Sequence, residues 1–135
     1  MSYEILPHTA DIRVKATGKT RAGLLVSMLK GMFAAAEPRP AAEAEEVKRP
    51  FKLEAVDFSA LLVDFLNEAV SQSDTNRESY EDVTFKLITD KQAEGAFIGR
   101  PVTGFETQIK AATHHGLEVK KNQSGEWETT VTFDA

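Results

Sequence analysis

The sequence predicts an α+β fold, a two-layer domain with two helices packed on antiparallel β-sheet. Two stretches carry apolar residues at helical spacing, and most of the remaining chain alternates apolar and polar residues as half-buried strands do. The elements follow in the order β-α-β, then α and several β, which favours antiparallel strands over a doubly wound parallel sheet. At 135 residues, 41% hydrophobic and 27% charged, the chain fits one soluble domain over residues 1–135.

The first strand and helix are predicted between residues 11 and 38. Apolar residues alternate from Ile12 to Ala16, which indicates a strand that Gly18 ends. Thr20 is a suitable N-cap for the helix that follows, and that helix should stop before Pro38. Its apolar stripe consists of Leu24, Leu25, Met28, Leu29, Met32 and Phe33.

The second helix gives the clearest periodic pattern. Residues 36–46 are acidic and rich in proline, which is typical of a connecting loop, and residues 47–56 alternate like a strand. Asp57 is then an expected N-cap for a helix from Phe58 to about Ser73. Its apolar face consists of Phe58, Leu61, Leu62, Phe65, Leu66, Ala69 and Val70.

Strand patterns dominate the rest of the chain. Strands are expected at residues 83–88, 96–102, 108–120 and 127–133, with turns at TDKQAEG (89–95) and KNQSGE (121–126). In the long strand, His115 should face the core and His114 the opposite side. The loop from Gly99 to Gln108 is a candidate partner contact. The two halves are candidate repeats of a β-α-β-β unit.

Composition excludes several classes of function. The chain has no cysteine, so disulfides, thiolate catalysis and cysteine-bound zinc are ruled out. Its formal net charge is -5, and its basic residues are scattered, so any RNA contact should be indirect. No apolar run approaches the length of a membrane span, and the start does not read as a signal peptide. We therefore expect a cytoplasmic protein.

Few residues remain that could perform chemistry. Phosphate-binding loops, nucleophile elbows and zinc motifs are absent from the sequence. Asp11 lies at the start of the first strand and Asp134 at the end of the last one. If the fold brings these carboxylates together, they repel unless a cation or a proton lies between them. Oxygen ligands of this kind suit Ca²⁺ or Mg²⁺.

Four segments together resemble the archease family, namely HTADI (8–12), LLVDFLNEAV (61–70), IKAATHHGLEV (109–119) and VTFDA (131–135). The resemblance implies a small α+β accessory protein of an RtcB-type RNA ligase, which joins RNA ends in tRNA splicing and RNA repair. It further implies that the protein promotes guanylation of the ligase and multiple turnover, and is not itself an enzyme.

The resemblance also implies a divalent-metal site, usually of calcium, with Mg²⁺ or Mn²⁺ as alternatives. Its ligands would be Asp11, Asp134 and a backbone oxygen of Ala135, or the free carboxylate of Ala135 if the chain ends there. His8 and Thr9 are expected to orient Asp11, and Lys110 and His114 are candidates to line the same side. Two alternatives remain open: a free-standing metal-dependent phosphohydrolase, and a chaperone-like binder without a metal role.

Overall fold

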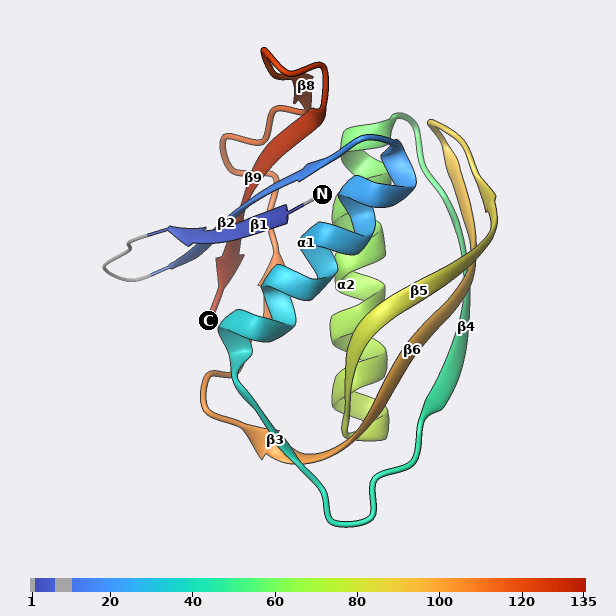
Figure 1. Ribbon diagram of the computed structural model, residues 1–135, viewed down its shortest axis with the longest axis vertical. Helices are drawn as coiled ribbons and strands as arrows, with labels where there is room; N and C mark the ends of the chain where they lie inside the picture. Colours follow the sequence, from blue (N-terminus) through green and yellow to red (C-terminus); the bar gives the residue numbers. More distant parts are fainter. Residues whose placement is uncertain (1, 7–10) are drawn as a thin grey trace.

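The computed structural model describes residues 2–6 and 11–135. It contains two helices and two antiparallel sheets, which confirms the α+β class (Figure 1). The first sheet has the order β1-β2-β9-β7, and β8 also pairs with β9. Its strands are β1 (Ser2–Leu6), β2 (Ile12–Gly18), β7 (Ala111–Ala112), β8 (Lys120–Lys121) and β9 (Trp127–Asp134).

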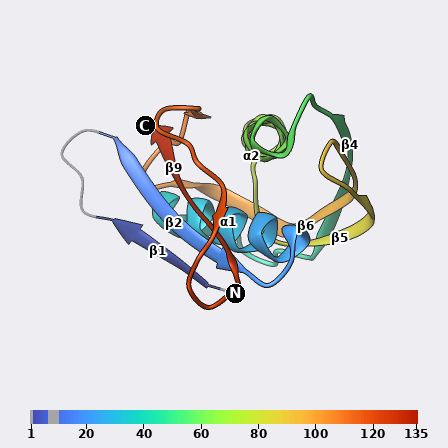
Figure 2. The same cartoon turned by 90° about the horizontal axis from the view of Figure 1, so that it is seen from above.

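The second sheet is built from the middle of the chain. Strand β6 (Gln92–Phe105) is its centre and pairs with β3 (Pro38–Pro40), β4 (Val47–Glu54) and β5 (Glu78–Ile88). Helix α2 (Phe58–Asn76) packs on β4, β5 and β6. Figure 2 looks along α2 and shows these strands curving around it. The elements β4, α2, β5 and β6 thus form a β-α-β-β unit. In the first half of the chain, β2 pairs with β9 and β3 pairs with β6. That the two halves are repeats of one unit stays a prediction.

Both predicted helix starts are confirmed. Helix α1 (Arg21–Ala36) begins after Thr20, whose side-chain oxygen accepts a hydrogen bond from the Gly23 N–H at 2.9 Å. The Ala60 N–H donates to Asp57 at the start of α2 in the same way, at 2.8 Å. Side-chain acceptors of this kind satisfy N–H groups that lack a partner within the helix. Helix α1 ends before Pro38 as expected, and α2 runs three residues past Ser73.

The core lies between the helices and the two sheets. Helix α1 contacts β1 and β2 of the first sheet and β5 of the second, so it joins the two sheets. The fully buried residues of the core include Leu25, Phe65, Phe97 and Phe133. The rings of Phe65 and Phe97 lie 5.3 Å apart. In the part of the chain that the structure describes, neither helix combines the length and apolar character needed to span a bilayer.

Several predicted strands need correction. The predicted strand 108–120 is wrong, because only β7 and β8 pair there, and Gly116 between them adopts a left-handed φ of 62°. The predicted strand 96–102 is too short, since β6 runs through part of the expected turn at 89–95 and most of the expected loop at 99–108. The loop at 36–46 contains β3, and β1 was not expected.

Candidate metal centre

The pairing of β2 with β9 brings Asp11 and Asp134 to the same end of the first sheet. Ile12 pairs with Phe133, and Asp11 and Asp134 are the next residues beyond that pair. Figures 1 and 2 both show the C-terminus near the start of β2. Ile12 and Phe133 are buried, whereas Asp11 and Asp134 are exposed, as expected when neighbouring strand residues face opposite sides. The two aspartates therefore belong to the outer face of this sheet.

Lys110 and Ala135 lie beside Asp134. The Lys110 N–H donates to the backbone oxygen of Asp134 at 2.8 Å, and Ala111 pairs with Asp134 in β7. Ala135 follows the end of β9 and is exposed, as is Lys110. The backbone oxygen of Asp134 thus already accepts one hydrogen bond. Its carboxylate oxygens are therefore more available than its backbone oxygen as ligands for a cation.

The histidines fall differently from the sequence prediction. His8 and Thr9 lie outside the described residues. His114 is exposed in the turn after β7, and its carbonyl accepts a hydrogen bond from the Leu117 N–H at 3.1 Å. His115 was expected to face the core, but it is exposed and lines a hollow together with Asp11. The predicted alternation failed because the chain turns at Gly116 instead of continuing as a strand.

The donor chemistry at Asp11 and Asp134 fits a hard cation. Both carboxylates lack a hydrogen bond or ion pair with any other described residue. Within residues 2–6 and 11–135, no group of three or more His, Asp or Glu residues is arranged to hold a metal ion. Because Ca²⁺ takes six to eight oxygen ligands, two aspartates would leave several positions for backbone oxygens, water or another ligand. The aspartates fit an open cation site and not a closed one.

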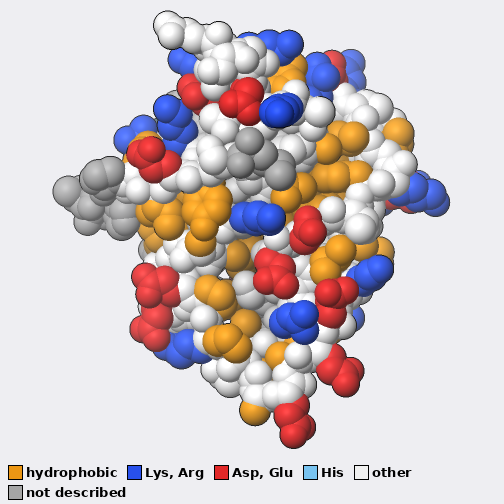
Figure 3. All heavy atoms as spheres, in the orientation of Figure 1, with side chains coloured by type: hydrophobic (Ala, Val, Ile, Leu, Met, Phe, Trp, Pro, Cys, Tyr) orange, Lys and Arg blue, Asp and Glu red, His pale blue; other side chains and the backbone are white. Residues whose placement is uncertain are grey.

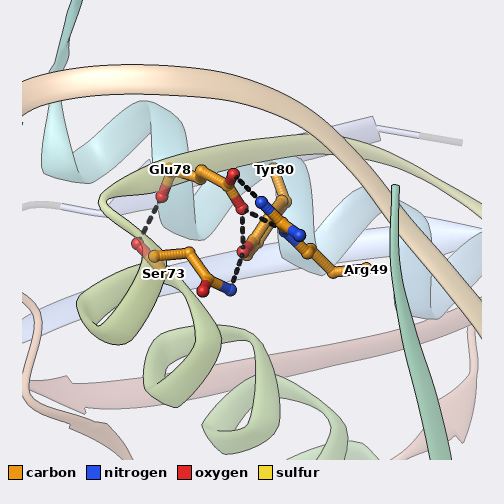
Figure 4. Close-up of polar contacts among 5 residues, drawn as sticks. Arg49, Ser73, Glu78 and Tyr80 are labelled. Atoms are coloured by element: carbon orange, nitrogen blue, oxygen red, sulfur yellow. Dashed lines mark hydrogen bonds and ion pairs between the residues drawn. The ribbon is translucent and has the colours of Figure 1, made fainter. Parts of the chain in front are cut away.

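A second cluster of charged and polar side chains joins β4, α2 and β5. Figure 4 shows Arg49, Glu78 and Tyr80 pointing toward one another. Arg49 donates two hydrogen bonds to the Glu78 carboxylate, at 2.8 and 2.6 Å, and the Tyr80 hydroxyl donates a third at 2.8 Å. Ser73 donates to the Glu78 backbone oxygen, and Asn76 to the Tyr80 hydroxyl. Every member of this cluster therefore has a partner.

The pKa values of the cluster follow from these contacts. The hydrogen bonds from Arg49, assisted by Tyr80, hold the pKa of Glu78 below its ordinary value, although burial opposes them. Burial raises the pKa of Tyr80 far above the ordinary value for a tyrosine. Glu78 is therefore ionised and Tyr80 neutral near pH 7, and neither is poised to exchange a proton. The cluster is best explained as part of the packing of the second sheet.

The surface carries no large patch of one charge on the face drawn in Figure 3. Acidic and basic side chains are interspersed there, with apolar side chains between them. Nucleic-acid binding relies on clustered Lys and Arg. This face therefore offers no support for direct RNA binding.

The described residues form a small α+β protein with two sheets and two helices around a common core. The chain matches the Archease protein family (MTH1598/TM1083) over residues 3–135. It belongs to that family.

Individual relatives agree with this assignment. The chain is 29% identical to a protein archease of Methanosarcina barkeri over 98% of this chain and 94% of the relative. It is 27% identical to a protein archease of Methanopyrus kandleri over 99% of both.

Two solved structures share the fold. One is the solution structure of protein 1598 of Methanobacterium thermoautotrophicum, with a TM-score of 0.70, 25% identity and 99% of each chain covered. The other is a crystal structure of an archease from Thermotoga maritima that is described as a possible chaperone, with a TM-score of 0.63 and 21% identity. That match covers 98% of this chain and 96% of the other.

Proposed function

We propose that this protein is an accessory factor that activates an RtcB-type RNA ligase in tRNA splicing and RNA repair. It promotes guanylation of the ligase and so allows multiple turnovers, and it contacts RNA only through the ligase. Membership of the archease family supports an accessory role of this kind. The observation that carries the proposal is the register of β2 and β9: Ile12 pairs with Phe133 at the end of the ladder, and Asp11 and Asp134 are the neighbouring residues just beyond that pair.

In this proposal the two aspartates hold a divalent cation, in the first place Ca²⁺. Ala135 would add a backbone oxygen, and Lys110 keeps the end of β9 in place through its hydrogen bond to Asp134. A bound cation would neutralise negative charge on a nucleotide at the ligase surface. Nucleotidyl transfer depends mainly on positioning and electrostatics, so a factor that adds both can raise turnover without being a catalyst itself.

The experiment is RNA joining by an RtcB-type ligase from the same organism, with RNA in large excess over ligase. The wild-type protein should raise the number of joined products well above one per ligase molecule. Asp11→Ala and Asp134→Ala should each reduce joining to the level of the ligase alone. Asp64→Ala removes another exposed carboxylate, on the surface of α2, and should behave as the wild type. Full activation by the Asp11 variant would contradict the proposal.

The two alternatives predict other outcomes of related experiments. A metal-dependent phosphohydrolase would release phosphate from nucleotides or RNA when incubated without ligase, in the presence of Mg²⁺ or Mn²⁺. A chaperone-like binder without a metal role would support the ligase equally well in both aspartate variants. We favour the metal-assisted role over both because Asp11 and Asp134 lie on neighbouring strand ends and their carboxylates have no partner among residues 2–6 and 11–135.

A further inference from the structure

A hollow lies on the outer face of the first sheet, next to Asp11. It encloses about 370 Å³ and opens to solvent. Ligand sites commonly begin at about 300 Å³, so the hollow is large enough for a small polar group. We call it the outer-face hollow; its lining residues are Asp11, Arg13, His115, Gly116, Thr130 and Thr132.

The hollow presents hydrogen-bond donors that no other described residue engages. Arg13 and Thr132 are cross-strand partners in β2 and β9. In the described part of the chain, the side chains of Arg13, Thr132 and His115 make no hydrogen bond or ion pair. By contrast, Lys15, the next outward residue of β2, forms an ion pair in which its Nζ lies 3.6 Å from Oε1 of Glu128. A guanidinium binds two oxygens of one phosphate at once, so Arg13 is the strongest of these donors.

The hollow is lined by β2, by β9 and by the turn that carries His115 and Gly116. The backbone N–H and the hydroxyl of Thr113 both donate to the Thr132 carbonyl, at 3.0 and 2.9 Å. Further along, the Thr129 hydroxyl donates to the Glu118 carbonyl at 2.8 Å. These bonds fix both ends of the turn to β9. The position of His115 above the sheet is therefore set by the fold.

The charges indicate what this hollow would hold. The two negative charges of Asp11 and Asp134 would neutralise a divalent ion. The positive charge of Arg13 would then remain without a counter-charge in the hollow. Arg13 lies two residues from Asp11, about 7 Å along the strand. A phosphate group is of a size to place one oxygen on the ion and others on Arg13. The nearby carboxylates make the hollow unfavourable for a phosphate when the ion is absent.

We propose that the outer-face hollow binds a phosphate group, held between the divalent ion at the aspartates and the donors of Arg13, His115 and Thr132. The phosphate is that of a nucleotide, because the proposed function has the protein contact RNA only through the ligase. The end of an RNA presents the same chemistry and is the alternative that the test separates. This inference rests on the metal site of the proposed function and adds the ligand class that this site receives.

The test is calorimetry of the whole chain in two steps. Mn²⁺ alone is titrated first. With Mn²⁺ at saturation, guanosine monophosphate and a short RNA with a 3′-phosphate are titrated next, beside guanosine and the same RNA with a 3′-hydroxyl. At least one phosphate probe should bind about tenfold or more tightly than its partner without phosphate, and the two arms identify the source. Bound Mn²⁺ should also broaden the ³¹P signal of that probe.

Variants assign the binding to the hollow. Arg13→Ala should weaken binding of the phosphate probe about tenfold or more. The affinity for Mn²⁺ should stay at least as high as in the wild type, because the substitution removes a positive charge near the ion. Thr132→Val should have a smaller effect in the same direction. Lys52→Ala removes one exposed positive charge from the second sheet and should match the wild type.

Each contrary result overturns a defined part of the account. If Mn²⁺ binds but neither phosphate probe does, or if Arg13→Ala binds the probe as the wild type does, the phosphate inference is wrong and the metal site stands. If Mn²⁺ does not bind at all, both the metal site and the phosphate inference are wrong. Activation of the ligase is measured separately and decides the proposed function.

Discussion

The two sheets treat charged side chains in opposite ways. In the second sheet, the buried Glu78 carboxylate receives hydrogen bonds from Arg49 and Tyr80. On the outer face of the first sheet, Asp11 and Arg13 are exposed and have no partner among the described residues. The same kinds of side chain are therefore closed to a ligand in one sheet and open to it in the other.

The difference separates charges that serve folding from charges that are free to bind. A buried carboxylate without partners is strongly destabilising, so Glu78 must be paired for the second sheet to form. Exposed charges stay hydrated and cost little when unpaired. Asp11 and Asp134 have no partner among the described residues, so their carboxylates contribute nothing to stability that a neutral residue would not. They are therefore the better candidates for function, and four predictions test this contrast.

The largest effect on stability is expected for Glu78→Ala. The substitution removes the acceptor for both Arg49 and Tyr80 and leaves a space in a packed region. The free energy of unfolding should fall by about 2–4 kcal/mol. Urea unfolding followed by circular dichroism measures the change. A loss below about 0.5 kcal/mol would show that the cluster is not needed for the fold.

The pH dependence of stability should come in part from the same carboxylate. The pKa of Glu78 is lower in the folded chain than its ordinary value of 4.5. The stability that it contributes is fully present above pH 4.5 and is lost as the pH falls through the lowered pKa of the folded state. Below pH 4.5, the wild type should therefore lose stability more steeply than Glu78→Gln. Parallel urea curves between pH 3 and 7 would show this, and identical slopes would contradict it.

A smaller effect is expected for Tyr80→Phe. The ring stays in place and stacks on Phe97, with ring centres 5.3 Å apart. Only the hydroxyl contacts with Glu78 and Asn76 are lost. Unfolding should become easier by about 1 kcal/mol. The measurement is again equilibrium unfolding, and an effect as large as that of Glu78→Ala would mean that Tyr80 and not Glu78 organises the cluster.

The smallest effect on stability is expected for the exposed aspartates of the first sheet. Asp11→Asn and Asp134→Asn, in a chelated buffer, should change the free energy of unfolding by no more than about 0.5 kcal/mol. Each variant removes an exposed charge that has no partner in the described residues. A loss of several kcal/mol in either variant would show that the aspartates are structural.

Much of the fold was predictable because its signals are local. Helix periodicity and the caps Thr20 and Asp57 depend on residues a few positions apart, and both helices were placed nearly correctly. The strand at residues 12–18 and the last strand were recognised from alternation alone. Asp11 and Asp134 were raised as a possible cation pair from their residue type and their places at strand ends, and the family resemblance then implied the metal site. Their assignment stays a prediction.

The misplaced strands depend on contacts that alternation does not reveal. Gly95 was placed at the end of an expected turn and Gly99 at the start of an expected loop, yet both lie within β6. The strand needs glycine there, because a Cβ at these positions would lie 2.0 and 1.9 Å from the carbonyl oxygens of Thr84 and Ser79. At residues 113–119 the alternation was accidental, since the backbone turns at Gly116. The exposed position of His115 beside Asp11 was missed for that reason, and a glycine directly after it was the available signal.

A Ca²⁺ titration by calorimetry at neutral pH decides whether Asp11 and Asp134 hold one ion between them. We expect one ion per wild-type chain, and loss of that binding in Asp11→Asn and equally in Asp134→Asn, because both carboxylates share the ion. Asp64→Asn, which alters a separate exposed carboxylate on α2, should bind as the wild type. Unchanged Ca²⁺ binding in either strand-end variant, or none in the wild type, would contradict the shared site.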